Sequence, residues 1–199
     1  MTLELFAKEL KLRDGETAVI RRLTVADGKA LQAFFRSLPA DDRLFLRDDV
    51  TQDAWLERFI RQVDNETLVA LVAEHGGDIV GHATLQRALH GWTRHVAEIR
   101  VVVARESQRK GLGTALAKAI TKLAVSLGLE KMVAHVVENQ VGAIKAFERL
   151  GFQKEAVLKN HVKDLRGMKR DLVVLSDDVS HLWSAMEALV SDYSPTIGD

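Results

Sequence analysis

The feature that most constrains the fold of this chain is a glycine-containing turn, SQRKGLGTAL, at residues 107–116. A run of valines precedes the turn, and a long stretch of helix-forming residues follows it. A strand that passes through glycines into a helix gathers the unpaired N–H groups of the first helical turn, where the helix dipole favours an anion. We therefore weigh a phosphate-binding loop at Gly111 and Gly113 against a compact strand-to-helix turn that binds nothing.

Two common phosphate-binding loops do not fit this turn. A Walker loop needs a lysine between its last glycine and the Ser/Thr, whereas Lys110 precedes the glycines and Thr114 follows Gly113 directly. A dinucleotide-binding fingerprint needs a third small residue at the position of Leu116. The strands before the turn are also predicted to form antiparallel hairpins. An NTPase and a Rossmann-type dehydrogenase are therefore disfavoured.

Hydrophobic periodicity predicts an α/β (α+β) fold with a central mixed, mostly antiparallel sheet of about seven strands flanked by helices. Strands are expected in hairpins around Asp14-Gly15, over 67–87 and over 152–176, and singly at 95–104 and 131–137. Helices are expected at 24–38, 51–62, 111–127 and 141–150, whereas 40–50 has an irregular pattern. The chain is predicted to be a single domain, 1–199, with a core at about 17–175 and an extra C-terminal helix at 177–192.

Composition narrows the classes of function. Lys plus Arg equals Asp plus Glu at 28 each, which gives no electrostatic case for a nucleic-acid or anionic-membrane partner. The absence of cysteine excludes disulfides, thiolate metal sites and a cysteine nucleophile. We find no signal-peptide pattern or apolar span, and we expect a cytoplasmic protein. His90 and His95 lack a third ligand at suitable spacing, so we expect no metal.

The turn QRKGLG at 108–113 is followed downstream by ENQVGAIKAFERLGF at 138–152. The first stretch resembles the signature Q/R-x-x-G-x-G/A of the GNAT superfamily of acetyl-CoA-dependent N-acetyltransferases, which lies between the fourth strand and the third helix. The second is similar to the asparagine after the fifth strand and the short helix ending in "lGF" in that family. The resemblance covers roughly residues 19–175 and implies a GNAT fold.

By this resemblance, the co-substrate is acetyl-CoA, and backbone amides of the loop would hold its pyrophosphate, with added charge from Arg109 and Lys110. The pantetheine arm would insert between the splayed fourth and fifth strands and pair with main-chain groups, one of which would also polarise the thioester carbonyl. An amide, from Asn139 or its neighbour Gln140, would hydrogen-bond the pantetheine. The implied cofactor-binding residues are Val101, Val102, Val103, Gln108, Arg109, Lys110, Gly111, Leu112, Gly113, Thr114, Asn139 and Phe147.

The acceptor amine must be neutral to attack, so a base or a water chain has to remove its proton. The resemblance makes Glu98 the first candidate catalytic residue and His135 the second, as base or water-holding residue. Strand alternation places Glu98 and Arg100 on one face, so a structural ion pair is an alternative role, and His135 could equally be a satisfied core histidine. Phe147 stands where many GNAT enzymes have a tyrosine acid, although a thiolate is a tolerable leaving group.

The sequence therefore predicts transfer of an acetyl group from acetyl-CoA to a primary amine, on a small molecule or a protein, by direct attack in a ternary complex. A non-catalytic acyl-CoA-binding or sensing module is the alternative, motivated by Phe147. A role in assembly, for example as a homodimer, is motivated by Trp183 and Met186 in the expected C-terminal helix. The acceptor pocket is expected to be bordered by 34–49, Trp55 and 161–168, and the aspartates of 41–49 either attract a cationic amine or form a solvated loop.

Overall fold

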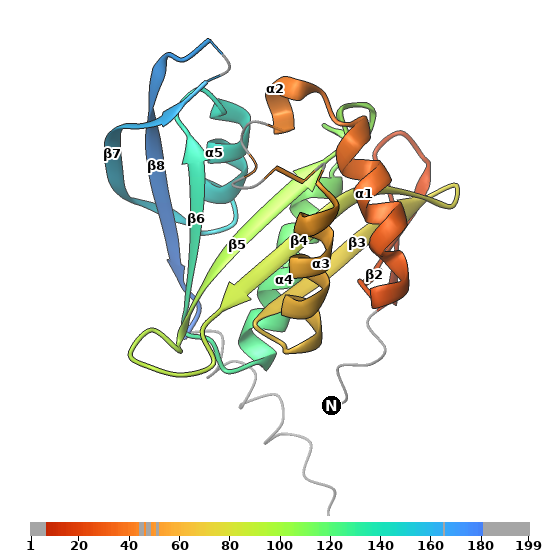
Figure 1. Ribbon diagram of the computed structural model, residues 1–199, viewed down its shortest axis with the longest axis horizontal. Helices are drawn as coiled ribbons and strands as arrows, with labels where there is room; N and C mark the ends of the chain where they lie inside the picture. The colour runs from red at the N-terminus through yellow and green to blue at the C-terminus, as the bar shows by residue number, and fades with distance from the viewer. Residues whose placement is uncertain (1–6, 44–45, 47–48, 51, 165, 181–199) are drawn as a thin grey trace, which may run out of the picture.

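An eight-stranded sheet with strand order β1-β2-β3-β4-β5-β6-β8-β7 forms the centre of the protein (Figure 1). The structure is a computed structural model that describes residues 7–43, 46, 49–50, 52–164 and 166–180. Neighbouring strands are antiparallel apart from β5 and β6, which are parallel. The strands are β1 Ala7–Lys11, β2 Thr17–Arg22, β3 Leu68–His75, β4 Asp78–Arg87, β5 Val96–Val103, β6 Lys131–Val137, β7 Gln153–Lys163 and β8 Lys169–Asp178.

Helices cover both faces of the central strands. The helices are α1 Gly28–Ser37, α2 Ala40–Arg43, α3 Asp53–Asp64, α4 Leu112–Ser126 and α5 Val141–Glu148. Figure 1 shows α1 and α3 in front of β3 and β4, with α4 behind the same strands. Within the described residues, we find no helix that combines the length and the apolar character needed to cross a membrane.

Two apolar cores result from this arrangement, and β3 contributes to both. Its first six residues are buried, because each face of the strand meets a helix layer. Side chains alternate across a strand, so Val69 and Leu71 join the core under α4, whereas Ala70 and Val72 join the core under α1 and α3. The continuous apolar run at 68–73 therefore marks the middle of the sheet.

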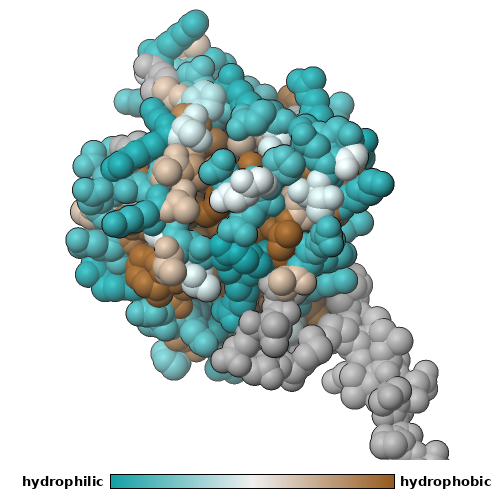
Figure 2. Space-filling view, turned by 90° about the vertical axis from the view of Figure 1, so that its right-hand side faces the viewer, coloured by the Kyte–Doolittle hydropathy of each residue, from teal (hydrophilic) through white to brown (hydrophobic). Residues whose placement is uncertain are grey.

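The edge strand β1 carries charged side chains. Its sequence AKELK places Lys8, Glu9 and Lys11 in solvent at the edge of the sheet. Figure 2, turned so that the right-hand side of Figure 1 faces the viewer, shows a mainly hydrophilic surface on which the apolar residues form separate patches. Charged residues on an edge strand disfavour pairing with another sheet edge.

Most of the predicted elements are present, with differences at the ends and in the count. The Asp14-Gly15 hairpin adds β1 to the sheet, so the described part of the chain has eight strands where about seven were expected, and the sheet extends beyond the expected core at 17–175. The stretch 40–50, expected to be irregular, begins with the short helix α2. The extra helix expected at 177–192 is wrong at its start, because β8 continues to Asp178, and from residue 181 it lies outside the described residues.

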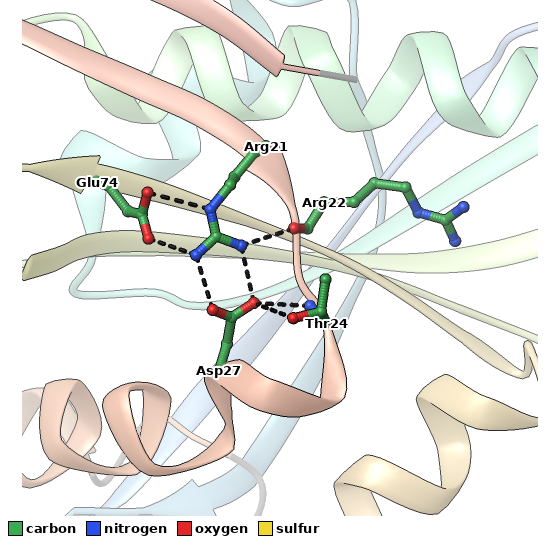
Figure 3. A network of polar contacts seen from close by, with 5 residues as sticks. All are labelled: Arg21, Arg22, Thr24, Asp27 and Glu74. Atoms are coloured by element: carbon green, nitrogen blue, oxygen red, sulfur yellow. Dashed lines mark hydrogen bonds and ion pairs between the residues drawn. The ribbon is translucent and has the colours of Figure 1, made fainter. Parts of the chain in front are cut away.

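One polar network joins the start of α1 to the sheet (Figure 3). Arg21 on β2 donates two hydrogen bonds to Asp27, at 2.8 and 2.7 Å, and two more to Glu74 on β3. The backbone N–H and the hydroxyl of Thr24 both donate to Asp27, at 2.7 and 2.9 Å. A planar guanidinium can satisfy two carboxylates in this way, so Arg21 fixes the chain as it leaves β2 and enters α1.

The network makes the free energy of unfolding depend on pH in the acidic range. Hydrogen bonds from Arg21, the largest cause, lower the pKa of Asp27 to about 2 from its usual 3.8. A carboxyl group with a depressed folded-state pKa stabilises the fold above its unfolded pKa, and this stabilisation is lost as pH falls through the folded pKa. Between pH 5 and pH 2, we expect the unfolding free energy of the wild type to fall by about 1 kcal/mol more than that of Asp27→Asn.

Urea unfolding followed at several pH values measures this difference. Asp78→Asn, at an exposed aspartate that begins β4, is the matched control and should keep the wild-type dependence on acid. An equal fall of the unfolding free energy with pH in the wild type and in Asp27→Asn would contradict the role of the network.

Candidate active site

The strands β5 and β6 part from each other in the middle of the sheet. Their parallel pairing covers only Val96 to Glu98 on β5 and Lys131 to Val133 on β6. Beyond this point β5 keeps its antiparallel partner β4 as far as Val103, and β6 keeps β8 as far as Val137. The gap between the two strands therefore has backbone groups along both of its sides, as the resemblance to GNAT proteins implied.

Strand geometry identifies which backbone groups face the gap. The N–H of Ala104 donates to Val80 on β4, at 3.0 Å. Backbone groups of an antiparallel strand alternate in direction, so the N–H of Val102 also points to β4, whereas those of Val101 and Val103 point into the gap. The carbonyl of Val103 accepts a hydrogen bond from the Gln108 side chain, at 3.0 Å. Val101 thus presents both of its backbone groups to the gap.

The glycine turn closes the open end of the gap. Gly111 precedes α4 with φ of 93°, a left-handed conformation that suits glycine, and Arg109 adopts φ of 61°. The bond from the Ala115 N–H to the Gly111 carbonyl, at 3.1 Å, closes the first turn of α4. The N–H groups at the first positions of a helix have no intrahelical partner, so those of residues 112–114 converge here. A Cβ added to Gly113 would contact the Val103 side chain at 3.5 Å.

Several side chains of this turn have structural partners. Lys110 forms ion pairs with Asp14 at 2.6 Å and Glu16 at 2.9 Å, and hydrogen bonds to these carboxylates, Asp14 first, raise the pKa of Lys110. The Leu112 side chain is buried in the core under α4. Arg109 is exposed. Besides the exposed Arg109, the donors that this turn leaves for an anion are therefore its backbone amides.

Glu98 connects two partners at the point where β5 and β6 part. Its side chain is 18% exposed, and its Oε1 lies 3.2 Å from an Arg100 guanidinium nitrogen and 3.4 Å from Nδ1 of His135. The ion pair with Arg100 that the alternation suggested is present. Because Glu98 also retains some access to solvent, this pairing leaves a role in proton transfer open to it.

A pocket lies on the α1/α3 side of β4 and β5, beside Glu98. Its lining residues are Phe35, Leu46, Val50, Trp55, Phe59, Gln62, Leu68, His82, Thr84, Gln86, Glu98, Arg100 and Val102. The polar floor comes from the two strands, and the aromatic wall comes from α1 and α3. Of the regions expected to border an acceptor, 34–49 and Trp55 contribute to this lining, whereas the described residues of 161–168 do not.

Sequence reasoning missed the β4 part of this floor. His82, Thr84 and Gln86 lie opposite Val102, Arg100 and Glu98 in the strand ladder. A signal was present in the sequence, because these polar residues alternate with Gly81, Ala83 and Leu85, which lie on the face of the sheet that packs against α4. Two aspartates of the expected acidic loop have partners: Asp42 forms an ion pair with Arg105 at 2.8 Å, and Asp49 accepts a hydrogen bond from Gln52 at 3.1 Å.

The second motif, at 138–152, follows β6 on the other side of the gap. Asn139 is exposed, and the Gln140 side chain accepts a hydrogen bond from the Val137 N–H, at 3.4 Å. Phe147 on α5 is 9% exposed and packs its ring against Phe152, with a centroid distance of 5.0 Å. Its ring is thus part of the apolar core and carries no acidic group. Tyr193, the only tyrosine of the sequence, lies outside the described residues.

Within the described part of the chain, no group of three or more His, Cys, Asp or Glu side chains is arranged to hold a metal ion. The recess beside His95 is lined by Gly91, Trp92, Arg94, His95 and Glu130.

Comparison with known proteins agrees with this architecture. The profile of the acetyltransferase (GNAT) family matches residues 30–152. The chain is 35% identical over 86 residues to the mycothiol acetyltransferase of Pseudarthrobacter chlorophenolicus, a match that spans 42% of this chain and 27% of that protein. It is 27% identical over 108 residues to the L-amino acid N-acetyltransferase AaaT of Escherichia coli K12, spanning 54% of this chain and 65% of that protein.

These matches cover less than two thirds of the length of either relative. Among solved structures, the GNAT domain of S. lividans PAT has a TM-score of 0.71 and 25% identity, over 86% of this chain and 96% of that domain. The family profile spans more than half of the sequence and includes the glycine turn, both parted strands and α5. This chain therefore belongs to the acetyltransferase (GNAT) family.

Proposed function

We propose that the protein transfers an acetyl group from acetyl-CoA to a primary amine, by direct attack of the amine within a ternary complex. The observation that carries this proposal is the parted pair of strands with a helix N-terminus at its open end. The parted strands offer backbone hydrogen-bonding groups to an extended chain, and the helix N-terminus offers its amides to a phosphate. Pantetheine and pyrophosphate are joined in this order in coenzyme A.

The described residues fit this co-substrate. The left-handed Gly111 and the absence of a side chain at Gly113 let a pyrophosphate approach the N–H groups of residues 111–114. The backbone of Val101 and the N–H of Val103 are directed toward the gap, where a pantetheine arm can pair with them as an added strand would. We assign Val102 a different role, because its side chain lines the acceptor pocket.

Acetyl-CoA supplies the thioester whose carbonyl carbon the amine attacks. The Val101 N–H is the main-chain donor best directed to stabilise the negative charge that develops on the carbonyl oxygen. A bond forms between the amine nitrogen and the carbonyl carbon while the bond from that carbon to sulfur breaks. The amine proton passes to Glu98, directly or through water held by His135, and the departing thiolate takes a proton from water.

A non-catalytic acyl-CoA-binding module is the second candidate function. The observation that favours it is the buried Phe147 ring, which packs on Phe152 and offers no proton to a departing thiolate. We place catalysis first because a thiol has a pKa of about 8.5, so a thiolate can leave near neutral pH without an enzymic acid.

Coenzyme binding tests the placement of the glycine turn. We expect Gly113→Glu to abolish binding of acetyl-CoA, because a carboxylate would enter the phosphate site. Gly113→Ala is the matched control: its methyl group would meet Val103 at an ordinary contact distance of 3.5 Å, so binding should be largely retained. Isothermal titration of the folded variants measures both affinities. Wild-type affinity in Gly113→Glu would show that the phosphates bind elsewhere.

Turnover tests the role of Glu98. Glu98→Gln keeps the shape of the side chain and removes its ability to accept a proton, so we expect roughly a 10²- to 10⁴-fold loss of kcat with unchanged affinity for acetyl-CoA. Thiol release with a panel of primary amines measures kcat, and calorimetry on the same samples measures affinity. Glu57→Gln, at an exposed glutamate of α3, is the control.

The outcomes of this experiment separate the two functions. Amine-dependent thiol release by the wild type supports the transferase. Tight binding of acetyl-CoA without release for any amine would favour the binding module. Loss of both affinity and thermal stability in Glu98→Gln would assign Glu98 to the structural ion pair with Arg100 alone.

A further inference from the structure

A buried histidine in the floor of the pocket has no hydrogen-bond partner at one of its ring nitrogens. His82 on β4 is 4% exposed, and its Nε2 is enclosed without a partner. Its ring packs edge-on against Phe35 at 5.3 Å between centroids and lies 5.7 Å from the ring of Phe59. Buried polar atoms of folded proteins are nearly always hydrogen-bonded, so this nitrogen calls for an explanation.

The imidazole is neutral at ordinary pH. Burial, the larger cause, and the charge of Arg100 lower the pKa of His82 to about 3. A neutral imidazole carries one donor and one acceptor nitrogen, and its tautomer adapts to the partner offered. A hydroxyl or an amide can satisfy Nε2 in either tautomer. By contrast, a second ammonium group in the pocket would meet the positive charge of Arg100 without a new counter-ion.

His82 lies in the floor of the pocket, opposite Val102 in the strand ladder. The floor consists of the ladder pairs Gln86–Glu98, Thr84–Arg100 and His82–Val102. From Glu98 to Val102 the floor extends over four residue steps, roughly 13 Å at the rise of a β-strand. The wall above it is formed by aromatic residues of α1 and α3. Glu98 and His82 thus occupy opposite ends of the floor, and Val101, whose N–H we assign to the thioester carbonyl, lies between them and next to Val102.

We propose that His82 is a specificity-determining residue that hydrogen-bonds, through Nε2, to a neutral polar group of the amine acceptor that lies away from its amine. The acceptor presents its amine between Glu98 and Val101, packs an apolar body against Phe35, Trp55 and Phe59, and carries a hydroxyl or amide that reaches His82. This inference rests on the proposed function for the position of the amine. It deepens that function by naming the chemical class of the acceptor.

The energetic consequence gives the proposal a signature of its own. Without an acceptor, the enclosed Nε2 destabilises the folded protein, because its hydrogen bond to water is lost and not replaced. His82→Phe keeps an aromatic ring against Phe35 and Phe59 and removes the unpaired nitrogen. We therefore expect this variant to have a higher Tm than the wild type and a poorer recognition of the acceptor.

The experiment compares matched amines that differ only in the polar group: tyramine with 2-phenylethylamine, and 6-aminohexan-1-ol with hexylamine. The wild type should prefer the hydroxylated member of a pair by roughly threefold to tenfold in kcat/KM, the effect of one hydrogen bond. In His82→Phe this preference should vanish through a rise in KM for the hydroxylated amine, with kcat unchanged. His82→Leu provides a second apolar variant, and His90→Phe, at an exposed residue of the loop after β4, is the control.

Calorimetric affinities of the same amines for the protein saturated with free CoA separate this inference from the proposed function. Absence of thiol release with every amine, but a hydroxyl preference in binding that His82→Phe removes, would reject the transferase and retain the assignment of His82. A preference that survives in His82→Phe and His82→Leu, or no preference in the wild type, would overturn the assignment. A lower Tm in both variants with equal losses for both amines would indicate a structural histidine and would also overturn it.

Discussion

The parting of β5 from β6 is the constraint on which the whole site depends. Beyond the point of parting each strand keeps its outer neighbour, β4 on one side and β8 on the other, so the gap removes hydrogen bonds only along the inner edges. Backbone groups inside a folded protein need partners, and here an extended ligand can supply them. Glu98 is the last residue of β5 that pairs with β6, which places a carboxylate where the gap begins.

The glycine turn complements this gap at its open end. The left-handed Gly111 directs the chain from the sheet into α4, so the first amides of the helix lie beside the end of β5. Two polar side chains of the turn contribute less to this site than their position suggests: Lys110 is paired with two carboxylates of the β1–β2 turn, and Gln108 caps the Val103 carbonyl. The proposed anion site is thus built mainly from backbone amides, while Lys110 and Gln108 hold the turn in place.

Local sequence was sufficient to predict the sheet, α4 and the glycine turn, because these elements depend on periodicity and on glycine at particular backbone conformations. The partners of Lys110 could not be predicted, since Asp14 and Glu16 are distant in sequence and meet it only through the β1–β2 hairpin. His82 was overlooked for a different reason. Its strand was predicted, but the significance of a polar residue on that face depends on α1 and α3, whose aromatic side chains enclose it.

The central claim is that the coenzyme binds in the gap as an added strand, and residue-resolved amide hydrogen exchange by NMR tests it most directly. Exchange rates would be compared in the protein alone and with saturating CoA. We predict marked slowing at Val101 and Val103, whose N–H groups face the gap, and little change at Val102, whose N–H is directed to β4. Unchanged rates at Val101 and Val103 in a protein that binds CoA would contradict it.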